Sequence, residues 1–212
     1  MTDQPSTSPT HDSDQAPSFT EQEPGRKGQI LDAALDVFAE RGYNGGSMRE
    51  IADRVGVSEP ALYRHFSGKE ALFVALMRIG AGRLRKEVLA LIDQLSPEGI
   101  SDQLPAVFAD RRRAVRRYER LFRAVLPTVV RNPSFVGEFR DGIAFPVREK
   151  LTEKAVEIDA YHQVVDAERT RDSRVRILMA LFVGTFMTSL VLADEPDRDA
   201  ADAALALMGW TR

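Results

Sequence analysis

The chain has 212 residues, of which 43% are hydrophobic, and its formal net charge is −3. This length suits one compact unit, or two small units that share a helix, with enough apolar residues to fill a core. The absence of cysteine excludes a disulfide framework and thiolate chemistry, and it fits a reducing cytoplasm. The N-terminus has neither a basic nor an apolar run, so we expect no signal peptide.

The charge is unevenly divided along the chain. Residues 1–24 hold five acidic and no basic residues, residues 25–86 have a balance of +4, and residues 87–212 have a balance of −2. Only the middle segment therefore attracts phosphate groups. Since +4 is a modest charge, we expect firm binding to nucleic acid to require two copies of the chain.

The first two elements follow from composition and periodicity. Residues 1–24 are rich in Ser, Thr, Pro, Asp and Gln, which predicts a disordered acidic tail. Simple solvation is its default role, and competition with DNA for the basic segment is the alternative. Residues 26–41 then carry Ile30, Ala34 and Phe38 on one stripe, which predicts a helix that ends at Gly42.

Residues 47–70 have the spacing of a helix-turn-helix. Ala52 allows two helices to pack closely, and Gly56 can take the positive φ that the tight turn needs. The inward positions are apolar: Ile51, Val55, Val57, Leu62 and Phe66. Each predicted helix start carries a cap signal, namely Ser47 with Glu50, Ser58 ahead of Pro60, and Ser67 with Glu70.

Polar side chains on the second helix of this hairpin suggest what it does. Tyr63, Arg64 and His65 occupy its exposed positions, and Lys69 begins the next helix. These residue types bind phosphates and base edges in recognition helices. Most helical hairpins do not touch DNA, however. A ligand- or partner-binding module with a purely structural hairpin therefore remains the alternative function.

The rest of the chain is predicted to be helical, which gives an all-α fold of about nine helices. A long helix is expected over residues 68–95, where Ser96-Pro97-Glu98-Gly99 ends it, and it belongs to both halves of the molecule. Further helices are expected at 101–114, 115–131, 134–158, 168–194 and 198–210. Prolines predict breaks at Asn132-Pro133 and Glu195-Pro196 and kinks at Pro127 and Pro146.

No pattern indicates catalysis, a metal, a cofactor or a membrane span. His11, His65 and His162 are far apart, and no phosphate-binding, nucleophile-elbow or zinc-ligand motif is present. The apolar run 177–193 falls short of the roughly 20 residues that a span requires. We therefore expect a non-enzymatic cytoplasmic protein without cofactor or metal.

Residues 28–76 resemble the tetracycline-repressor (TetR) family of bacterial transcription regulators. The resemblance is carried by FAERGY at 38–43, IA at 51–52, GVS at 56–58, LYRHF at 62–66 and KEAL at 69–72. It implies a DNA-binding head at 25–70, and an effector-binding and dimerisation domain at 71–212.

The resemblance also implies roles for individual head residues. Ser47, Tyr63, His65 and Lys69 would bind phosphates, Ser58 would cap the recognition helix, and Arg49, Glu59, Pro60, Ala61 and Arg64 would lie near base edges. Two positions depart from the family pattern. Met48 stands where a hydroxyl residue is common. Glu59 is an acid at a base-reading position, where it would accept from a cytosine amine or repel phosphate.

For the second domain the resemblance implies a cavity for a small effector, whose identity the sequence does not give. Candidate lining residues are Phe108, Phe122, Phe135, Phe139, Phe145, Phe182 and Phe186, for each of which an ordinary core position is the alternative. The arginines between 111 and 123 are expected to form a solvated surface. Alternatively, one of them turns inward to an anionic effector such as a fatty acid or an acyl thioester.

Small and apolar residues on the last two helices predict a dimer interface. The candidates are Ile177, Leu181, Gly184, Thr188, Val191, Leu205 and Met208, which would form a four-helix bundle with a second copy. Such a homodimer requires a palindromic operator in double-stranded DNA. The family's usual mode implies a repressor that an effector releases from its operator.

Overall fold

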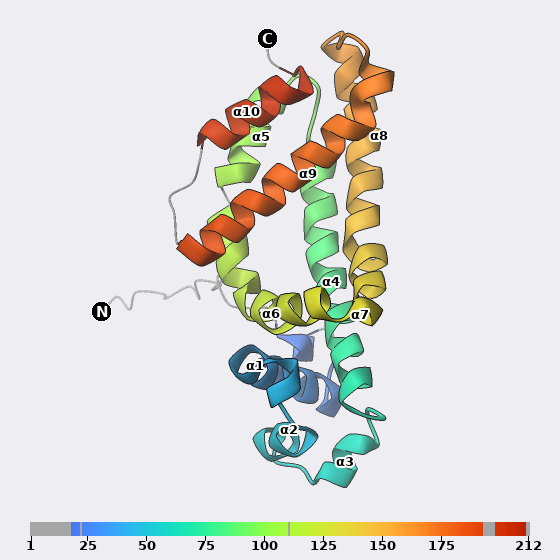
Figure 1. The fold of residues 1–212 in the computed structure, drawn as a ribbon, viewed down its shortest axis with the longest axis vertical. Helices are drawn as coiled ribbons and strands as arrows, with labels where there is room; N and C mark the ends of the chain where they lie inside the picture. The colour runs from blue at the N-terminus through green and yellow to red at the C-terminus, as the bar shows by residue number, and fades with distance from the viewer. Residues whose placement is uncertain (1–17, 22, 110, 193–197, 211–212) are drawn as a thin grey trace, which may run out of the picture.

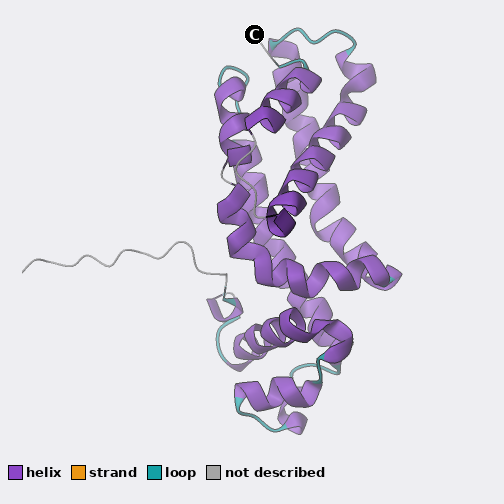
Figure 2. Ribbon diagram, turned by 60° about the vertical axis from the view of Figure 1, so that its left-hand side comes forward, coloured by secondary structure: helices purple, strands orange, loops and turns teal. Residues whose placement is uncertain are grey.

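The structure is a computed structural model, and it describes residues 18–21, 23–109, 111–192 and 198–210, with the side chains of 109, 111–116, 185–192 and 198–199 outside this description. Every regular element in these residues is a helix (Figures 1 and 2), so the all-α prediction is confirmed. A head formed by α1 (Arg26–Gly45), α2 (Met48–Val55) and α3 (Glu59–Tyr63) occupies one end of an elongated molecule. Helix α4 (Lys69–Asp93) runs from the head into the body (Figure 1).

The body is built from the remaining helices around α4. They are α5 (Ile100–Ala109), α6 (Arg111–Arg131), α7 (Pro133–Phe139), the π-helix η2 (Arg140–Ala144), α8 (Phe145–Tyr161), α9 (Ala167–Leu192) and α10 (Arg198–Met208). Helix α6 lies across the base of the body and packs against α1, while α5 and α10 pack together at the opposite end (Figure 1). The body therefore rests on the head through α4 and α6.

The buried side chains that the structure describes form two hydrophobic cores, and the first one crosses from head to body. It joins Ile30, Phe38 and Leu62 of the head to Tyr118 and Leu121 of α6. The second core lies between α5, α8, α9 and α10. A division at residue 70 therefore does not separate two cores, because the head completes its own core with side chains from the body.

The hairpin has most of the local features that its sequence predicts. The Ser47 hydroxyl accepts from the Glu50 amide at 3.1 Å and the Ser58 hydroxyl from the Ala61 amide at 3.4 Å. Gly56 ends α2 in the left-handed region with φ 74°. The third cap is wrong, because α4 begins at Lys69 after an extended Gly68 and without a side-chain cap.

Pro146 produces a π-helix where the sequence predicted a kink. Proline has no amide hydrogen, so it cannot donate to the carbonyl four residues earlier, which is that of Gly142. The helical ladder widens to a π turn over η2, and the Arg85 guanidinium donates to the Gly142 carbonyl at 3.2 Å. The freed acceptor is thus satisfied from α4.

Other predicted boundaries moved. The helices expected at 101–114 and 115–131 correspond to α5 and α6, and the predicted boundary between residues 114 and 115 is wrong because it falls inside α6. Residue 110, between the two helices, lies outside the described residues. Pro127 lies within α6. The predicted break at Glu195-Pro196 also lies outside the described residues.

The predicted disordered tail ends earlier than residue 24. Residues 1–17 lie outside the described residues, but Phe19–Glu21 forms the short helix η1 beside α1. The Phe19 ring is only 3% exposed and belongs to the first core. Composition alone missed this segment because a single aromatic anchor, rather than average hydrophobicity, fixes it.

Candidate nucleic-acid interface

The predicted DNA-contacting residues lie together at the free end of the head. Ser47 and Arg49 stand at the start of α2, and the others follow on α3, in the turn after it and at the start of α4. Seven of the ten are exposed: Ser47, Arg49, Ser58, Pro60, Tyr63, Arg64 and His65. Glu59, Ala61 and Lys69 are half-buried. This end of the molecule is therefore open to a large partner.

Ion pairs divide the arginines of the head into two groups. Arg41 pairs with Glu50 at 2.8 Å, and Arg54 makes two hydrogen bonds of 2.9 Å to Glu40. The hydrogen bond from Arg54 lowers the pKa of Glu40, so this pair is ionised at neutral pH. Arg49 and Arg64 make no ion pair with any residue that the structure describes. Their charges are thus available to an external anion.

Lys69 is held beside the start of α2. Its ammonium donates to the Gly46 carbonyl at 3.1 Å and lies 4.7 Å from the centre of the Tyr43 ring. Gly46 is closely packed, since a Cβ there would lie 2.8 Å from a methyl of Val37. Lysine has three donors, so this placement leaves it free to bind a phosphate next to Ser47.

Tyr43 also belongs to an aromatic cluster that links the head to α7. Its ring centre lies 4.8 Å from that of Phe73 and 5.8 Å from that of Phe135. Burial, followed by the charge of Glu70, raises the pKa of Tyr43. Phe135, predicted to line an effector cavity, is instead 1% exposed in the first core, and Phe122 and Phe139 pack against that core.

The other predicted cavity residues are dispersed. Phe108 and Phe182 meet edge to face at 5.6 Å in the second core, whereas Phe145 is 42% exposed beside Arg140 and Arg148. The side chain of Phe186 lies outside the described residues. The candidate phenylalanines thus do not form a single cluster, because helical periodicity shows that a residue is apolar but not which core it joins.

The predicted dimer stripe is only partly on the surface. Ile177 is 49% exposed and Gly184 is exposed, but Leu205 and Met208 are buried against their own chain, and Leu181 is half-buried. The side chains of Thr188 and Val191 lie outside the described residues. For Leu205 and Met208 the prediction is wrong, because that side of α10 packs on α5 and α9.

A different set of small and apolar residues is exposed on these two helices. It consists of Ala180 and Val183 on α9 and of Ala203, Ala206 and Leu207 on α10. Helix α10 is thus apolar on two sides, one of which meets the body and one of which meets solvent. Alternating Ala and Leu in 203–208 is the sequence signal for the second side.

Two kinds of site are not found among the described residues. None of their helices is long and apolar enough to cross a membrane. Within the same ranges, no three His, Cys, Asp or Glu side chains come together as metal ligands would.

An exposed, capped helical hairpin on an all-helical body, whose Arg49 and Arg64 form no ion pair with a described residue, has the geometry of a helix-turn-helix of the DNA-binding kind. The comparisons with known proteins agree. Residues 30–76 match the family of bacterial regulatory proteins described as tetR. Over 53 residues the chain is 55% identical to the transcriptional activator FasR of Mycolicibacterium smegmatis, a match that covers 25% of this chain and 24% of FasR. Over 63 residues it is 44% identical to the repressor AcnR of Corynebacterium diphtheriae, covering 30% of this chain and 33% of AcnR.

Solved structures match most of the chain. A TetR-like transcriptional regulator from Rhodococcus sp. RHA1 shares 25% identity with a TM-score of 0.55, over 85% of this chain and 91% of that one. FadR from Bacillus subtilis, solved in complex with stearoyl-CoA, shares 17% identity with a TM-score of 0.60, over 86% and 97%. Residues 30–76 thus match the DNA-binding head of the tetR family, and most of the chain has the fold of a solved TetR-like regulator.

Proposed function

We propose that this chain acts as a homodimer that binds a palindromic operator and represses transcription until a small effector releases it. The observation that supports the DNA-binding part is a contrast between exposed arginines of the head. Arg49 and Arg64 form no ion pair with a described residue, whereas Arg41 and Arg54 each pair with a glutamate. An arginine that has no carboxylate to satisfy it is suited to phosphates or to guanine edges.

The head residues divide by their expected contacts. Ser47, Tyr63, His65 and Lys69 are proposed to bind phosphates and so to set the register on the duplex. Arg49 and Arg64, with Glu59, Pro60 and Ala61, are proposed to face base edges. Glu59 is half-buried at the start of α3 and would favour a cytosine amine over a phosphate.

Matched variants separate these roles in gel shifts against the DNA that flanks the protein's own gene. Arg64→Ala is expected to cost about 1–3 kcal/mol on the preferred site and to relax base preference at one position. Lys69→Ala should weaken binding to all sequences alike and reduce the salt slope by about one ion per head. Arg54→Ala is the control, because its charge is already occupied by Glu40. Equal losses for Arg64→Ala and Arg54→Ala would contradict the proposed interface.

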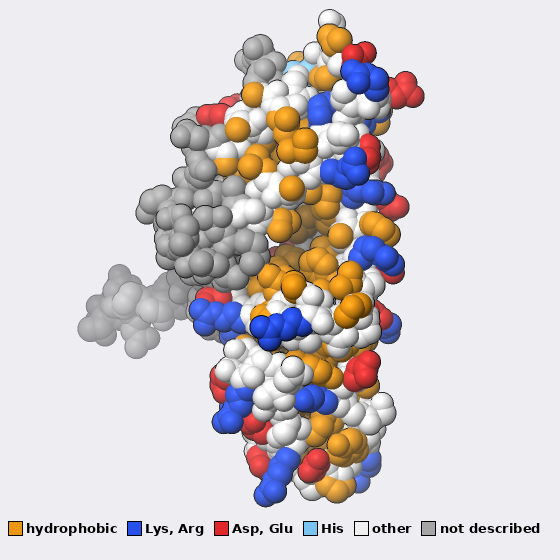
Figure 3. All heavy atoms as spheres, in the orientation of Figure 1, with side chains coloured by type: hydrophobic (Ala, Val, Ile, Leu, Met, Phe, Trp, Pro, Cys, Tyr) orange, Lys and Arg blue, Asp and Glu red, His pale blue; other side chains and the backbone are white. Residues whose placement is uncertain are grey.

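The exposed apolar face on α9 and α10 supports the dimer. It comprises Ile177, Ala180, Val183, Gly184, Ala203, Ala206 and Leu207. Hydrophobic side chains are visible over these two helices in Figure 3. A two-fold axis through this face would set two heads side by side, and each head would read one half of a palindrome.

We propose a long-chain acyl thioester as the effector. Figure 3 shows a hollow in the body between α6 and α9, with hydrophobic side chains around it. FadR from Bacillus subtilis, which has the same fold, was solved with stearoyl-CoA. An apolar hollow fits the acyl chain of such a ligand, and a basic side chain would pair with its phosphates.

Linkage gives the test of this induction model. If the effector weakens operator binding by some factor, the operator must weaken effector binding by the same factor. Stearoyl-CoA and stearate should first be screened by thermal shift, and the better ligand then titrated with and without operator DNA. Equal affinity in the two titrations would mean that the ligand does not induce release.

Repression is proposed because a dimer seated on an operator excludes other proteins from the DNA that it covers. A reporter behind the bound DNA should gain expression when the gene is deleted. Similar heads occur in the activator FasR and in the repressor AcnR. A loss of expression would therefore indicate activation instead of repression, and the DNA-binding proposal would stand. A chain that stays monomeric and binds DNA without salt dependence would instead favour the ligand- or partner-binding module.

A further inference from the structure

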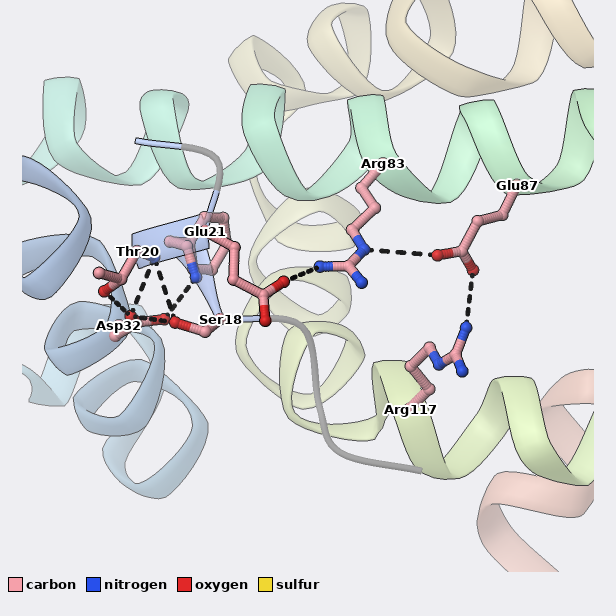
Figure 4. A network of polar contacts seen from close by, with 8 residues as sticks. Ser18, Thr20, Glu21, Asp32, Arg83, Glu87 and Arg117 are labelled. Atoms are coloured by element: carbon pink, nitrogen blue, oxygen red, sulfur yellow. Dashed lines mark hydrogen bonds and ion pairs between the residues drawn. The ribbon is translucent and has the colours of Figure 1, made fainter. Parts of the chain in front are cut away.

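A short segment at the N-terminal end of the described chain touches both the head and the body. Residues 18–21, here called the strap, lie on α1, and the side chain of Glu21 reaches α4 (Figure 4). Because α1 belongs to the head and Arg83 lies in the body half of α4, the strap bridges the two parts.

The contact with α1 is made by several hydrogen bonds to one carboxylate, that of Asp32. The Asp32 carboxylate accepts from the Ser18 hydroxyl at 2.8 Å, from the Phe19 amide at 2.7 Å, and from the Thr20 amide and hydroxyl at 3.2 and 2.7 Å (Figure 4). The Phe19 ring is buried in the first core. A carboxylate that accepts several hydrogen bonds orders the segment that supplies them.

The sequence of α1 is fitted to the strap. Gly28 lies directly under it, and a Cβ at this position would come within 2.2 Å of the Glu23 carbonyl oxygen and 2.7 Å of the Thr20 Cα. Both of these are backbone atoms, which cannot turn aside as a side chain would. A glycine inside a helix otherwise lowers stability. Its presence at position 28 therefore indicates that the close approach of the strap backbone to α1 requires a residue without a side chain.

The contact with the body is a ladder of charges. Glu21 pairs with Arg83 at 3.1 Å, Arg83 with Glu87 at 3.4 Å, and Glu87 with Arg117 of α6 at 3.5 Å (Figure 4). The Glu21 side chain is 68% exposed. An exposed ion pair is weak compared with a buried aromatic ring. The strap is therefore bound strongly to the head and only weakly to α4.

We propose that the strap braces the head against α4 and thereby narrows the range of head orientations. A tilt of α4 relative to α1 must stretch or break the Glu21–Arg83 pair, while the strap stays on α1. With fewer orientations to exclude on binding, the two heads of a dimer meet their half-sites at a smaller entropic cost. The consequence for DNA rests on the proposed function, whereas the bracing of α4 does not.

The test compares two carboxylates that are two residues apart. Glu21→Gln removes the contact with α4, and Glu23→Gln makes the same charge change but faces Lys27 of the head. For the full-length protein on the DNA flanking its own gene, we expect Glu21→Gln to weaken binding about threefold more than Glu23→Gln at low salt. Equal affinities of the two glutamine variants would overturn the proposal.

Hydrogen exchange on the full-length protein supplies a readout that does not depend on DNA. Glu21→Gln should speed exchange of the α4 amides around Arg83 relative to wild type, and Glu23→Gln should not. Thr20→Glu places a second carboxylate against Asp32, so it should release the strap and reproduce the Glu21→Gln pattern on α4. If the wild-type protein binds no DNA, the proposed function fails, and the hydrogen-exchange rates alone test whether the strap braces α4. Equal exchange rates of the α4 amides in Glu21→Gln and Glu23→Gln would contradict the bracing.

Discussion

Replacing Asp159 with alanine is expected to destabilise the protein by about 3–5 kcal/mol, because it leaves a buried arginine without its counter-ion. Asp159 on α8 is 2% exposed, and Arg174 on α9 is 8% exposed. The carboxylate accepts from Arg174 Nη1 and Nη2 at 3.0 and 2.8 Å, from Arg171 Nε at 3.0 Å and from Trp210 Nε1 at 2.9 Å. This node fastens the end of α10 to α8 and α9.

Thermal unfolding at a single protein concentration measures the effect. A loss of this size corresponds to a fall in Tm of about 10 °C for a chain of this length. Asp172→Ala is the matched control, since its pair with Arg176 is i,i+4 and both side chains are more than 60% exposed. Its loss should stay below about 1 kcal/mol. A Tm for Asp159→Ala within a degree of the control would show that Arg174 finds another partner.

The pH dependence of the same variant follows from the ionisation of the carboxyl. Burial opposes ionisation of Asp159, but the hydrogen bonds from Arg174, Trp210 and Arg171 outweigh it, so its pKa lies below the ordinary value of 3.8. A lowered pKa contributes stability that is present above the ordinary value and is lost as the pH falls through the folded-state pKa. The gap between wild type and Asp159→Ala should therefore hold from about pH 7 to pH 5 and shrink in more acidic solution. A gap that widened in acid would contradict this direction.

The head could be predicted from sequence because its signals are local. Ser47, Gly56 and Ser58 each act within four residues of their position, through a cap hydrogen bond or a positive φ, and all three predictions hold. The apolar anchors Ile51 and Leu62 are buried as predicted. The failed cap at Ser67 shows the limit, because the extended Gly68 after it takes the N-cap position of α4.

What the sequence could not place depends on contacts between distant residues. Asp159, Arg174 and Trp210 are spread over 51 residues, and nothing in their spacing marks them as one node. Phe19 and Asp32 likewise read as a tail residue and a surface acid until the strap docks. On α10 both sides are apolar, so periodicity alone could not say which side meets the body and which is left for a partner.

The corrected apolar face leads to the second large effect, which is the loss of the proposed dimer in Gly184→Arg. Gly184 is exposed on α9, and a Cβ added there meets nothing within 4 Å. Arginine is also a better helix former than glycine. The protomer should therefore fold normally, while a charge without a counter-ion at the centre of a buried interface should cost several kcal/mol of association.

Sedimentation and operator binding measure the consequence together. We expect Gly184→Arg to sediment as a monomer at concentrations where wild type is a dimer, and to lose at least about a hundredfold in operator affinity, because each head then binds its half-site alone. Gly184→Ala is the control for the backbone change, and Ala160→Arg, exposed on α8, is the control for the added charge. Both should remain dimers. If Gly184→Arg also sediments as an intact dimer, the subunits associate elsewhere, and the two heads are not set side by side by α9 and α10.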